Sequence, residues 1–402
     1  MRCSPRRASG AEPVSVSTSS TDHAGATLSV LMFASGATAV SNSIIFAALG
    51  DLQDNYGFAD FGLGLIAGIG FLAGLVTQVF VAPLADTHKP KNLMVIGLVF
   101  AALGSLVFAL GDSLWQFVIG RAIVGVSFGC TQPAARAIAA NLDMGRAAER
   151  LGKLAGVETA GIVGGPFIGG IMLDPLGLRW TFVFFAIVAA VASLALAAKA
   201  LPMLPSSGES RRISLTLLRY PGVRTVALTT MSLYLPIGVY DALWDRYLTD
   251  RGASNFVVGL SFLIYGIPFI LLARLGGRLA DKWGALRTAL YAIFILTPVV
   301  TGYGLAATPL AIIIVSVIEG VVQAVTIPAS QASMSHVAPE GRAAAAQGLS
   351  GAANLVGAAA TAFVSPWIYG AHGPVWAFGV ISLAMLTLSL VAQTMARRHS
   401  LI

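Results

Sequence analysis

The sequence predicts an all-α integral membrane protein with twelve transmembrane helices, arranged as two similar six-helix halves around a central cavity. Three observations support this prediction: the composition, the apolar segments and an internal repeat. Of the 402 residues, 56% are hydrophobic and only 11% are charged. An ordinary soluble domain carries roughly 25% charged residues. The composition therefore excludes the soluble globular class.

Apolar segments of membrane-spanning length recur along most of the chain. A hydrocarbon core of about 30 Å is crossed by a helix of roughly 20 residues. We expect such helices at 28–50, 61–83, 92–111, 114–140, 152–173, 180–201, 223–248, 256–276, 288–306, 309–335, 344–368 and 374–395. The remaining predicted parts are a disordered cytoplasmic tail at 1–27, a cytoplasmic linker at 202–222 between the halves 28–201 and 223–395, and a cytoplasmic tail at 396–402.

Basic residues cluster on one face of the predicted bundle. They lie at 2–7, 88–91, 146–153, 211–224, 274–287, 342 and 397–398, in alternate connections of a twelve-helix chain. Connections rich in Lys and Arg stay in the cytoplasm. We therefore expect a multi-pass protein of the cell membrane with both termini in the cytoplasm. The net charge of +7 reflects this bias and requires no nucleic-acid partner.

The two halves of the chain carry the same short motifs at a nearly constant spacing. PLAD at 83–86 matches RLAD at 278–281, TQPA at 131–134 matches TIPA at 326–329, and GRAA at 145–148 recurs at 341–344. Trp180 and Trp376 follow the same spacing of 195 or 196 residues. Ordered matches with a single-residue drift indicate a duplicated six-helix unit. Such repeats are typical of transporters, whose substrate site lies where the repeats meet near the bilayer midplane.

The connection after the second predicted helix of each half carries a recognisable motif. Residues 277–287 read GRLADKWGALR, and the first-half copy keeps Asp86 but lacks both glycines and the basic residue after the aspartate. From about residue 28 to 395, these features resemble the major facilitator superfamily. The resemblance implies that Asp86 pairs with Arg136 and latches the cytoplasmic side, with Asp281 and Lys282 in the matching element. The alternative is that Asp86 only caps a loop.

A second motif lies in the fifth predicted helix, which holds several glycines and a proline in apolar surroundings. Its pattern is Gly152-x8-Gly161-x3-Gly165-Pro166-x2-Gly169-Gly170, and it is similar to that of the drug/proton antiporters of this superfamily. Glycines four residues apart form a smooth face that another helix can approach closely, and proline bends a helix. We expect this helix to rock and seal at the interface between the halves. The alternative is ordinary close packing.

The resemblance also implies a cavity lined by the first, fourth, seventh and tenth helices, which carry polar stripes. In the tenth helix, the polar residues from Glu319 to Ser330 follow the spacing of one helical face. The residues that we expect at the cavity are Asn42, Gln132, Tyr240, Trp244, Tyr265, Gln323, Thr326 and Asn354.

Four ionisable residues inside predicted spans are the candidates for proton coupling: Glu319, Asp241, Glu158 and Arg121. A charge within the membrane costs at least about 2.5 kcal/mol, so its presence indicates function. Apolar surroundings favour the protonated form of a carboxylate, and a nearby cation favours the ionised form. We expect Glu319 to carry the proton, with Asp241 or Glu158 as alternatives. A static ion pair, such as Arg121 with Glu158, is the structural alternative.

The leading hypothesis is a proton-coupled efflux antiporter for small amphipathic or drug-like organic compounds, working by alternating access. Two alternatives stay open: a permease for a sugar, an amino acid or another metabolite, because a fold does not fix a substrate, and a receptor-like membrane protein without transport. The sequence shows neither a Walker A motif nor a cluster of metal ligands. We therefore expect no enzyme activity, cofactor or metal. The expected partners are the substrate, protons and the lipid bilayer, and the expected state is a monomer.

Overall fold

The structure is a computed structural model that describes residues 18–81, 90–141, 147–199, 215–340 and 342–402. The regular secondary structure of these residues is helical throughout. The elements are α1 (Thr18–Ser43), η1 (Ile44–Ala47), α2 (Leu49–Tyr56), α3 (Asp60–Phe80), α4 (Pro90–Leu110), α5 (Leu114–Asn141), α6 (Ala147–Ala198), η4 (Leu215–Arg219), α7 (Pro221–Thr249), α8 (Asn255–Trp283), α9 (Ala285–Leu305), α10 (Pro309–Val337), α11 (Ala343–His372) and α12 (Pro374–Arg398). The predicted all-α fold class is confirmed.

Eleven helices in the described ranges are long and apolar enough to cross a membrane, and one of them, α6, is long enough to cross it twice. As one straight helix, the 52 residues of α6 would extend over about 78 Å, whereas the hydrocarbon core is about 30 Å thick. The backbone leaves the helical conformation at Gly177 (φ 71°, ψ 172°), two residues after Pro175. α6 is therefore two membrane-spanning helices joined at Gly177, which brings the crossings in these ranges to the expected twelve.

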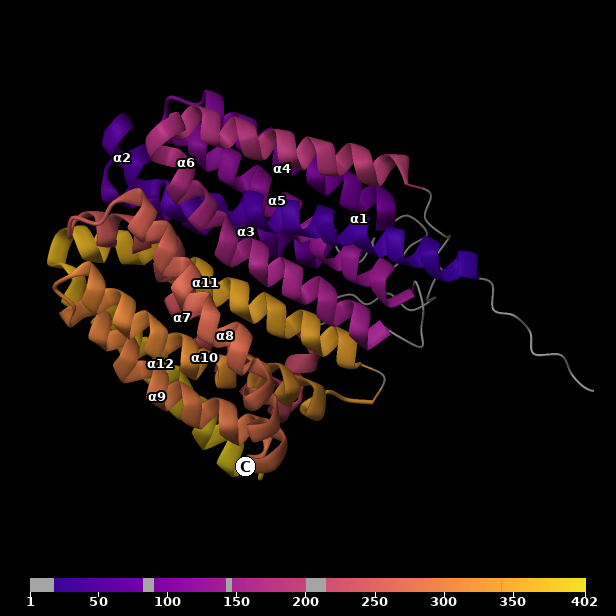
Figure 1. The fold of residues 1–402 in the computed structure, drawn as a ribbon. Helices are drawn as coiled ribbons and strands as arrows, with labels where there is room; N and C mark the ends of the chain where they lie inside the picture. Colours follow the sequence, from indigo (N-terminus) through magenta and orange to yellow (C-terminus); the bar gives the residue numbers. More distant parts are fainter. Residues whose placement is uncertain (1–17, 82–89, 142–146, 200–214, 341) are drawn as a thin grey trace, which may run out of the picture.

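The helices form two bundles, which Figure 1 shows as α1–α6 in indigo to magenta and α7–α12 in orange to yellow. Two helix pairs join them. α3 packs against α11, where a Cβ atom at Gly64 would lie 2.7 Å from the carbonyl oxygen of Phe363. α6 packs against α8, where a Cβ atom at Gly259 would lie 2.6 Å from the carbonyl oxygen of Pro166. Gly64 and Gly259 are equivalent positions of the sequence repeat, so both bundles use the same position for close approach.

An apolar core joins the two bundles at the end where α2 lies, called here the α2 end. Ile45 and Leu49 of the first half share one buried cluster with Val239 and Leu243 of α7. At the opposite end, called the terminal end because α1 begins and α12 ends there, each half has its own cluster. These contain Leu31, Leu93, Leu154 and Leu196 in the first half, and Leu217, Val223, Leu290 and Ala392 in the second. Figure 1 shows the bundles diverging toward the terminal end. The halves are therefore closed at the α2 end.

Some helix ends differ from the expected ones. α1 begins at Thr18, inside the segment expected to be a disordered tail, and α12 continues to Arg398. The first expected span, 28–50, is not one helix, because η1 and Ala48 (φ −128°, ψ −4°) separate α1 from α2. Hydropathy locates the stretch that crosses the membrane, but it carries no information on where the backbone leaves the helical conformation. Of the expected linker, residues 200–214 lie outside the described ranges.

Candidate functional site

A buried ion pair connects the two halves. Nη2 of Arg121, on α5, lies 2.9 Å from Oδ2 and 3.2 Å from Oδ1 of Asp241, on α7. The two side chains are only 2% and 1% exposed. Buried charges require a partner, because each loses its hydration on leaving water. The structure therefore brings together two of the four ionisable candidates, one from each half.

Three further elements position the guanidinium of Arg121. Its Nη1 donates to the backbone oxygen (2.6 Å) and to Oδ1 (3.2 Å) of Asn42 near the end of α1. The ring of Phe46 in η1 lies 5.4 Å from the guanidinium carbon, within cation–π range. Gly70 of α3 makes room, because a Cβ atom there would lie 2.5 Å from Nε. Asn42, an expected cavity residue, is thus a direct partner of Arg121.

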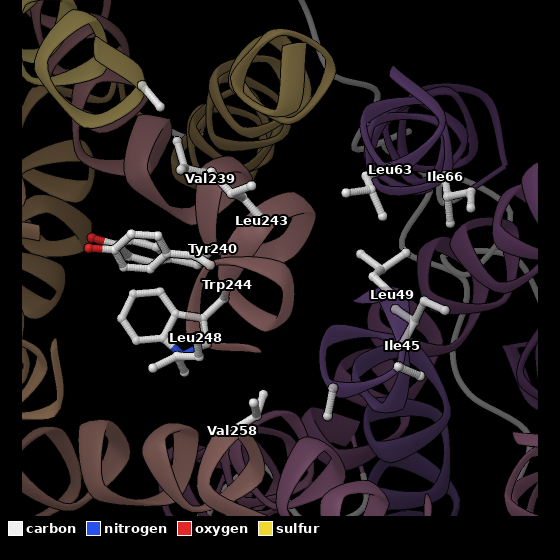
Figure 2. Packing of buried hydrophobic residues seen from close by; sticks show 14 of the residues in the cluster. Ile45, Leu49, Leu63, Ile66, Val239, Tyr240, Leu243, Trp244, Leu248 and Val258 are labelled. Atoms are coloured by element: carbon white, nitrogen blue, oxygen red, sulfur yellow. The ribbon is translucent and has the colours of Figure 1, made fainter. Parts of the chain in front are cut away.

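Glu319 lies in a separate cluster inside the second half. Its side chain is fully buried. Oε2 accepts a hydrogen bond from the hydroxyl of Tyr303 on α9 (2.5 Å), and Oε1 accepts one from the hydroxyl of Tyr240 on α7 (2.8 Å). Oε1 also accepts from Nε2 of Gln323, one turn along α10 (2.8 Å). Figure 2 shows Tyr240 on the side of α7 turned away from Ile45 of the first half. All of these partners of Glu319 belong to its own half.

The remainder of the polar face of α10 packs against α7. The hydroxyl of Thr326 donates to the backbone oxygen of Val322 in its own helix (2.8 Å). Ser330 shares a hydrogen bond with Thr230 of α7 (3.0 Å). Gln323 and Thr326 are 1% and 0% exposed. The structure therefore places these two expected cavity residues in the interior of the second half, because hydroxyl and amide groups can bond within a bundle as well as face water.

Glu158 of α6 is paired within the first half. Its Oε2 accepts hydrogen bonds from Nη2 of Arg136 (2.9 Å) and from Nε2 of Gln132 (3.3 Å), both on α5. The Glu158 side chain is 5% exposed and that of Arg136 is 54% exposed. The structural alternative expected from the sequence, an ion pair of Arg121 with Glu158, is therefore wrong. Arg136 lies about 22 Å further along α5 than Arg121, nearer the terminal end. Asp86, the expected partner of Arg136, lies outside the described residues.

The other expected cavity residues are dispersed over several contacts. Trp244 is buried, and its Nε1 donates to a serine hydroxyl of α8 (2.8 Å). Tyr265 on α8 and Asn354 on α11 are half-buried. Oδ1 of Asn354 is a buried oxygen that has no hydrogen-bond partner among the described residues. The expected gating residues of the second-half motif, Asp281 and Lys282, are exposed at the terminal end of α8.

The glycine motif of α6 serves two interfaces. Gly161, Gly165 and Gly169 pack against α1 and η1, within the first half. A Cβ atom at Gly161 would lie 2.7 Å from a side-chain carbon of α1. The neighbouring face of α6, with Pro166 and Gly170, meets α8 of the second half. The interface between the halves is therefore formed by the face beside the three evenly spaced glycines.

Asp245 is not among the site residues expected from the sequence, and the structure places it at the interface. Asp245 is 2% exposed, and its Oδ2 accepts a hydrogen bond from the backbone N–H of Gly50 in α2 (2.6 Å). A usable signal was present, because Asp245 follows Asp241 by four residues and both must project from one face of α7. Two carboxylates on one helix face near the end of a span indicate a shared surface.

Polar contacts between the halves continue at the surface of the α2 end. Nη1 of Arg246 lies 2.5 Å from Oδ1 of Asp54, and Nδ2 of Asn255 donates to Asp51 (3.0 Å) and to Asp174 (2.8 Å). Burial raises the pKa of Asp51 above its usual value, the hydrogen bond from Asn255 lowers it, and the charges of Asp174 and Asp54 raise it. Within the described ranges, no group of three or more His, Cys, Asp or Glu side chains is placed to bind a metal ion.

Comparisons of the sequence identify related proteins. The family model described as Major Facilitator Superfamily matches residues 31–228 and 223–399. The multidrug resistance protein MdtG of Klebsiella pneumoniae (strain 342) is 24% identical over 277 residues, which are 67% of this chain and 67% of that protein. MdtG of Salmonella schwarzengrund (strain CVM19633) is 25% identical over 277 residues, which are 67% of this chain and 69% of that protein.

Solved structures share the fold at low sequence identity. A mutant of the nucleoside transporter NupG has a TM-score of 0.76 at 12% identity, covering 92% of this chain and 99% of that chain. A bacterial homolog of the human lysosomal transporter Spinster, inward-facing and occupied, has a TM-score of 0.74 at 14% identity, covering 93% and 97%. A D-xylose–proton symporter has a TM-score of 0.69 at 16% identity, covering 90% and 96%. These likenesses establish the fold, which hosts different substrates in different proteins.

Proposed function

We propose that this chain, which belongs to the major facilitator superfamily, is a proton-coupled antiporter that exports small amphipathic organic compounds across the cell membrane. Membership of this family indicates a transporter rather than an enzyme. The observation that carries the proposal is the ion pair of Arg121 with Asp241, which is buried and is shared between the two halves. The proposed monomer operates by alternating access, with protons and the lipid bilayer as its other partners.

Rocking of the halves distinguishes the two buried carboxylates. In alternating access, each half moves largely as a unit around the site between them. Glu319 bonds to residues of its own half, so its hydrogen bonds move with that half. Asp241 bonds to Arg121 on the other half, so this contact changes when the halves part. Because a proton on Asp241 would cancel its attraction for Arg121, we assign the proton to Asp241.

The ion pair also favours antiport over symport. With Asp241 ionised and no substrate bound, its attraction for Arg121 holds the α2 end closed. To complete its cycle, a symporter must switch its empty, ionised site from one side of the membrane to the other. An antiporter must not make this switch with an empty, ionised site, because it would then dissipate the proton gradient without moving substrate. A cationic group on a substrate can replace Arg121 as the partner of Asp241, so proton and substrate occupy the site in turn.

The substrate class rests on the relatives and on the aromatic surroundings. The MdtG proteins are named multidrug resistance proteins, which supports drug-like organic compounds. The ring of Phe46 lies 5.4 Å from the guanidinium carbon of Arg121, and an aromatic ring beside the ion pair suits an amphipathic ligand. The second candidate is a metabolite permease, because the structures of the same fold include a nucleoside transporter and a xylose–proton symporter.

We place the terminal end in the cytoplasm. Basic side chains gather there at the ends of the helices, among them Arg278 and Lys282 in the last turns of α8 and Arg287 in the first turn of α9, and segments rich in Lys and Arg remain on the cytoplasmic side. Both termini are then cytoplasmic. Closed at the α2 end, the protein is in the cytoplasm-facing state, in which an exporter takes up its substrate.

Asp241→Asn and Glu319→Gln form a matched pair of tests, because each replaces a carboxylate by the amide of the same size. In proteoliposomes with an imposed pH gradient, the unmodified protein should accumulate ethidium, a cationic amphipathic dye. Asp241→Asn should reduce gradient-driven accumulation to background, and the remaining dye binding should be weaker and independent of pH. Glu319→Gln should keep the coupling and lose about 1–2 kcal/mol of unfolding free energy through a weakened hydrogen-bond cluster.

Opposite outcomes have definite meanings. Loss of coupling in Glu319→Gln, with coupling retained in Asp241→Asn, moves the proton to Glu319, as expected from the sequence alone. Dye transport by the unmodified protein without any response to the pH gradient rejects proton coupling. Gradient-driven transport of a nucleoside or a sugar in place of the dye supports the metabolite permease.

A further inference from the structure

α2 is a short helix that cannot cap its own N-terminus. The chain leaves α1 at Ser43, makes the 3-10 turn η1 and passes Ala48 before α2 begins at Leu49. Ala48 is the N-cap residue, and its methyl side chain makes no capping hydrogen bond. The first N–H groups of a helix have no partner inside the helix, so another group must accept their hydrogen bonds.

Asp245 of the other half supplies this acceptor. Its Oδ2 lies 2.6 Å from the backbone nitrogen of Gly50, the second residue of α2. A carboxylate in this position also interacts favourably with the positive end of the helix dipole. Gly50 permits the approach, because a Cβ atom there would already lie 3.2 Å from Oδ2. Asp245 therefore caps a helix that belongs to the opposite half.

The position of Asp245 on α7 connects this cap to the ion pair. Asp241 and Asp245 are one helical turn apart on one face of α7, and each bonds to the first half. Gly50 and Asp245 are 195 residues apart, which is the spacing of the internal repeat. The cap thus joins two equivalent positions where the halves meet. One turn further along, the hydroxyl of Thr249 donates to Asp245 within α7 (3.4 Å).

We infer that Asp245 is a positioning residue for the gate at the α2 end, because its cap on α2 sets how readily this end opens. The inference rests on the proposed function only in that transport requires this end to open. The cap must break when the halves part, since its donor and its acceptor lie on different halves. Ala48 offers no replacement, so α2 loses its cap on opening. A stronger cap favours the closed end, and a weaker one favours the open end.

Distances between spin labels at the α2 end test this inference by pulsed electron paramagnetic resonance. The labels are attached at Asp112→Cys, between α4 and α5, and at Ala307→Cys, between α9 and α10, where both positions are exposed. The native residues Cys3 and Cys130 are replaced by serine. Asp245→Ala should raise the ratio of open to closed protein roughly fivefold, the factor expected for loss of an N-cap. Asp245→Asn keeps an oxygen acceptor, so its ratio of open to closed protein should lie between that of the parent and that of Asp245→Ala.

Two further variants make the test decisive. Thr249→Ala is the matched control, because it removes a hydrogen bond to Asp245 without touching the contact between the halves, and its distances should equal those of the parent. Gly50→Ala adds a methyl group on α2 that crowds Oδ2 of Asp245, so it should also favour the open end. This variant keeps the test valid if Asp245→Ala fails to fold. Distances unchanged from the parent in every folded variant overturn the inference. Because neither substrate nor a pH gradient is present, a shift stands even if proton coupling fails in the transport assay.

Discussion

The two halves repeat one fold, but equivalent positions carry different charges. Asp241 and Asp245 on α7 correspond to Phe46 and Gly50 in the first half, and Arg121 on α5 corresponds to Ser316 on α10. A strictly symmetric arrangement would place a second aspartate at position 50, directly opposite Asp245, and like charges repel. Because the cation belongs to one half and the carboxylates to the other, the charges attract. The difference between the halves therefore holds the α2 end closed.

The backbones of the two halves differ at the same place. The first half breaks between α1 and α2, whereas α7 continues as one helix to Thr249. The break leaves the N–H of Gly50 without an acceptor in its own helix, and the continuous helix presents Asp245 to it. The first half thus supplies the hydrogen-bond donor, and the second half supplies the acceptor. The repeat aligns these segments, and the departure from the repeat creates the polar contacts between them.

Asp241→Leu makes the second half as apolar as the first at this position and should have the largest effect. It leaves Arg121 buried without a counter-charge, which should cost about 3–5 kcal/mol of unfolding free energy. Adding Arg121→Met removes the unpaired charge, so the double variant should recover most of the loss. Chemical unfolding of the purified protein in detergent measures both. Equal stability of the single and double variants would show that an unpaired Arg121 costs no stability.

Gly165 and Gly170 separate packing within a half from packing between halves. A Cβ atom at Gly165 would clash with the hydroxyl oxygen of Ser43 in α1, and one at Gly170 would clash with the carbonyl oxygen of Asn255 in α8. Gly165→Ala should lower the unfolding free energy by about 1–3 kcal/mol and leave the spin-label distances unchanged. Gly170→Ala should favour the open α2 end, with a smaller loss of stability. The reverse pattern would assign the interface to the evenly spaced glycines.

The surface of the α2 end should respond weakly to pH through Asp51. Burial, together with the charges of Asp174 and Asp54, raises the pKa of Asp51 when this end is closed. A group with a higher pKa in the closed form binds its proton more tightly there, so acidification should favour closure. The expected effect is below about 1 kcal/mol. Spin-label distances recorded from about pH 7 to pH 4 should show it, and Asp51→Asn should abolish it. A full pH response in Asp51→Asn would point to another group.

Hydropathy located most spans closely. The expected helix at 92–111 is α4 (Pro90–Leu110), and the one at 309–335 is α10 (Pro309–Val337). Both begin at a proline, which is favoured in the first turn of a helix. The expected helix at 28–50 contains the break at Ala48. Leu49 and Gly50 continue the apolar segment past this break and the first charged residue is Asp51, so hydropathy does not mark the break itself.

By itself, the sequence determined the membrane class, the repeated halves, the close packing at the glycines and the presence of ionisable residues within the spans. These features follow from composition and spacing along the chain. Only the tertiary structure decided that Arg121 pairs with Asp241, that Glu158 pairs with Arg136, and that Glu319 lies among tyrosines of its own half. It also assigned Asp245 to the N-terminus of α2. The reason is that a charge in a membrane must find a partner, but helical periodicity defines only the direction in which each side chain points, and the packing of the helices determines which groups meet.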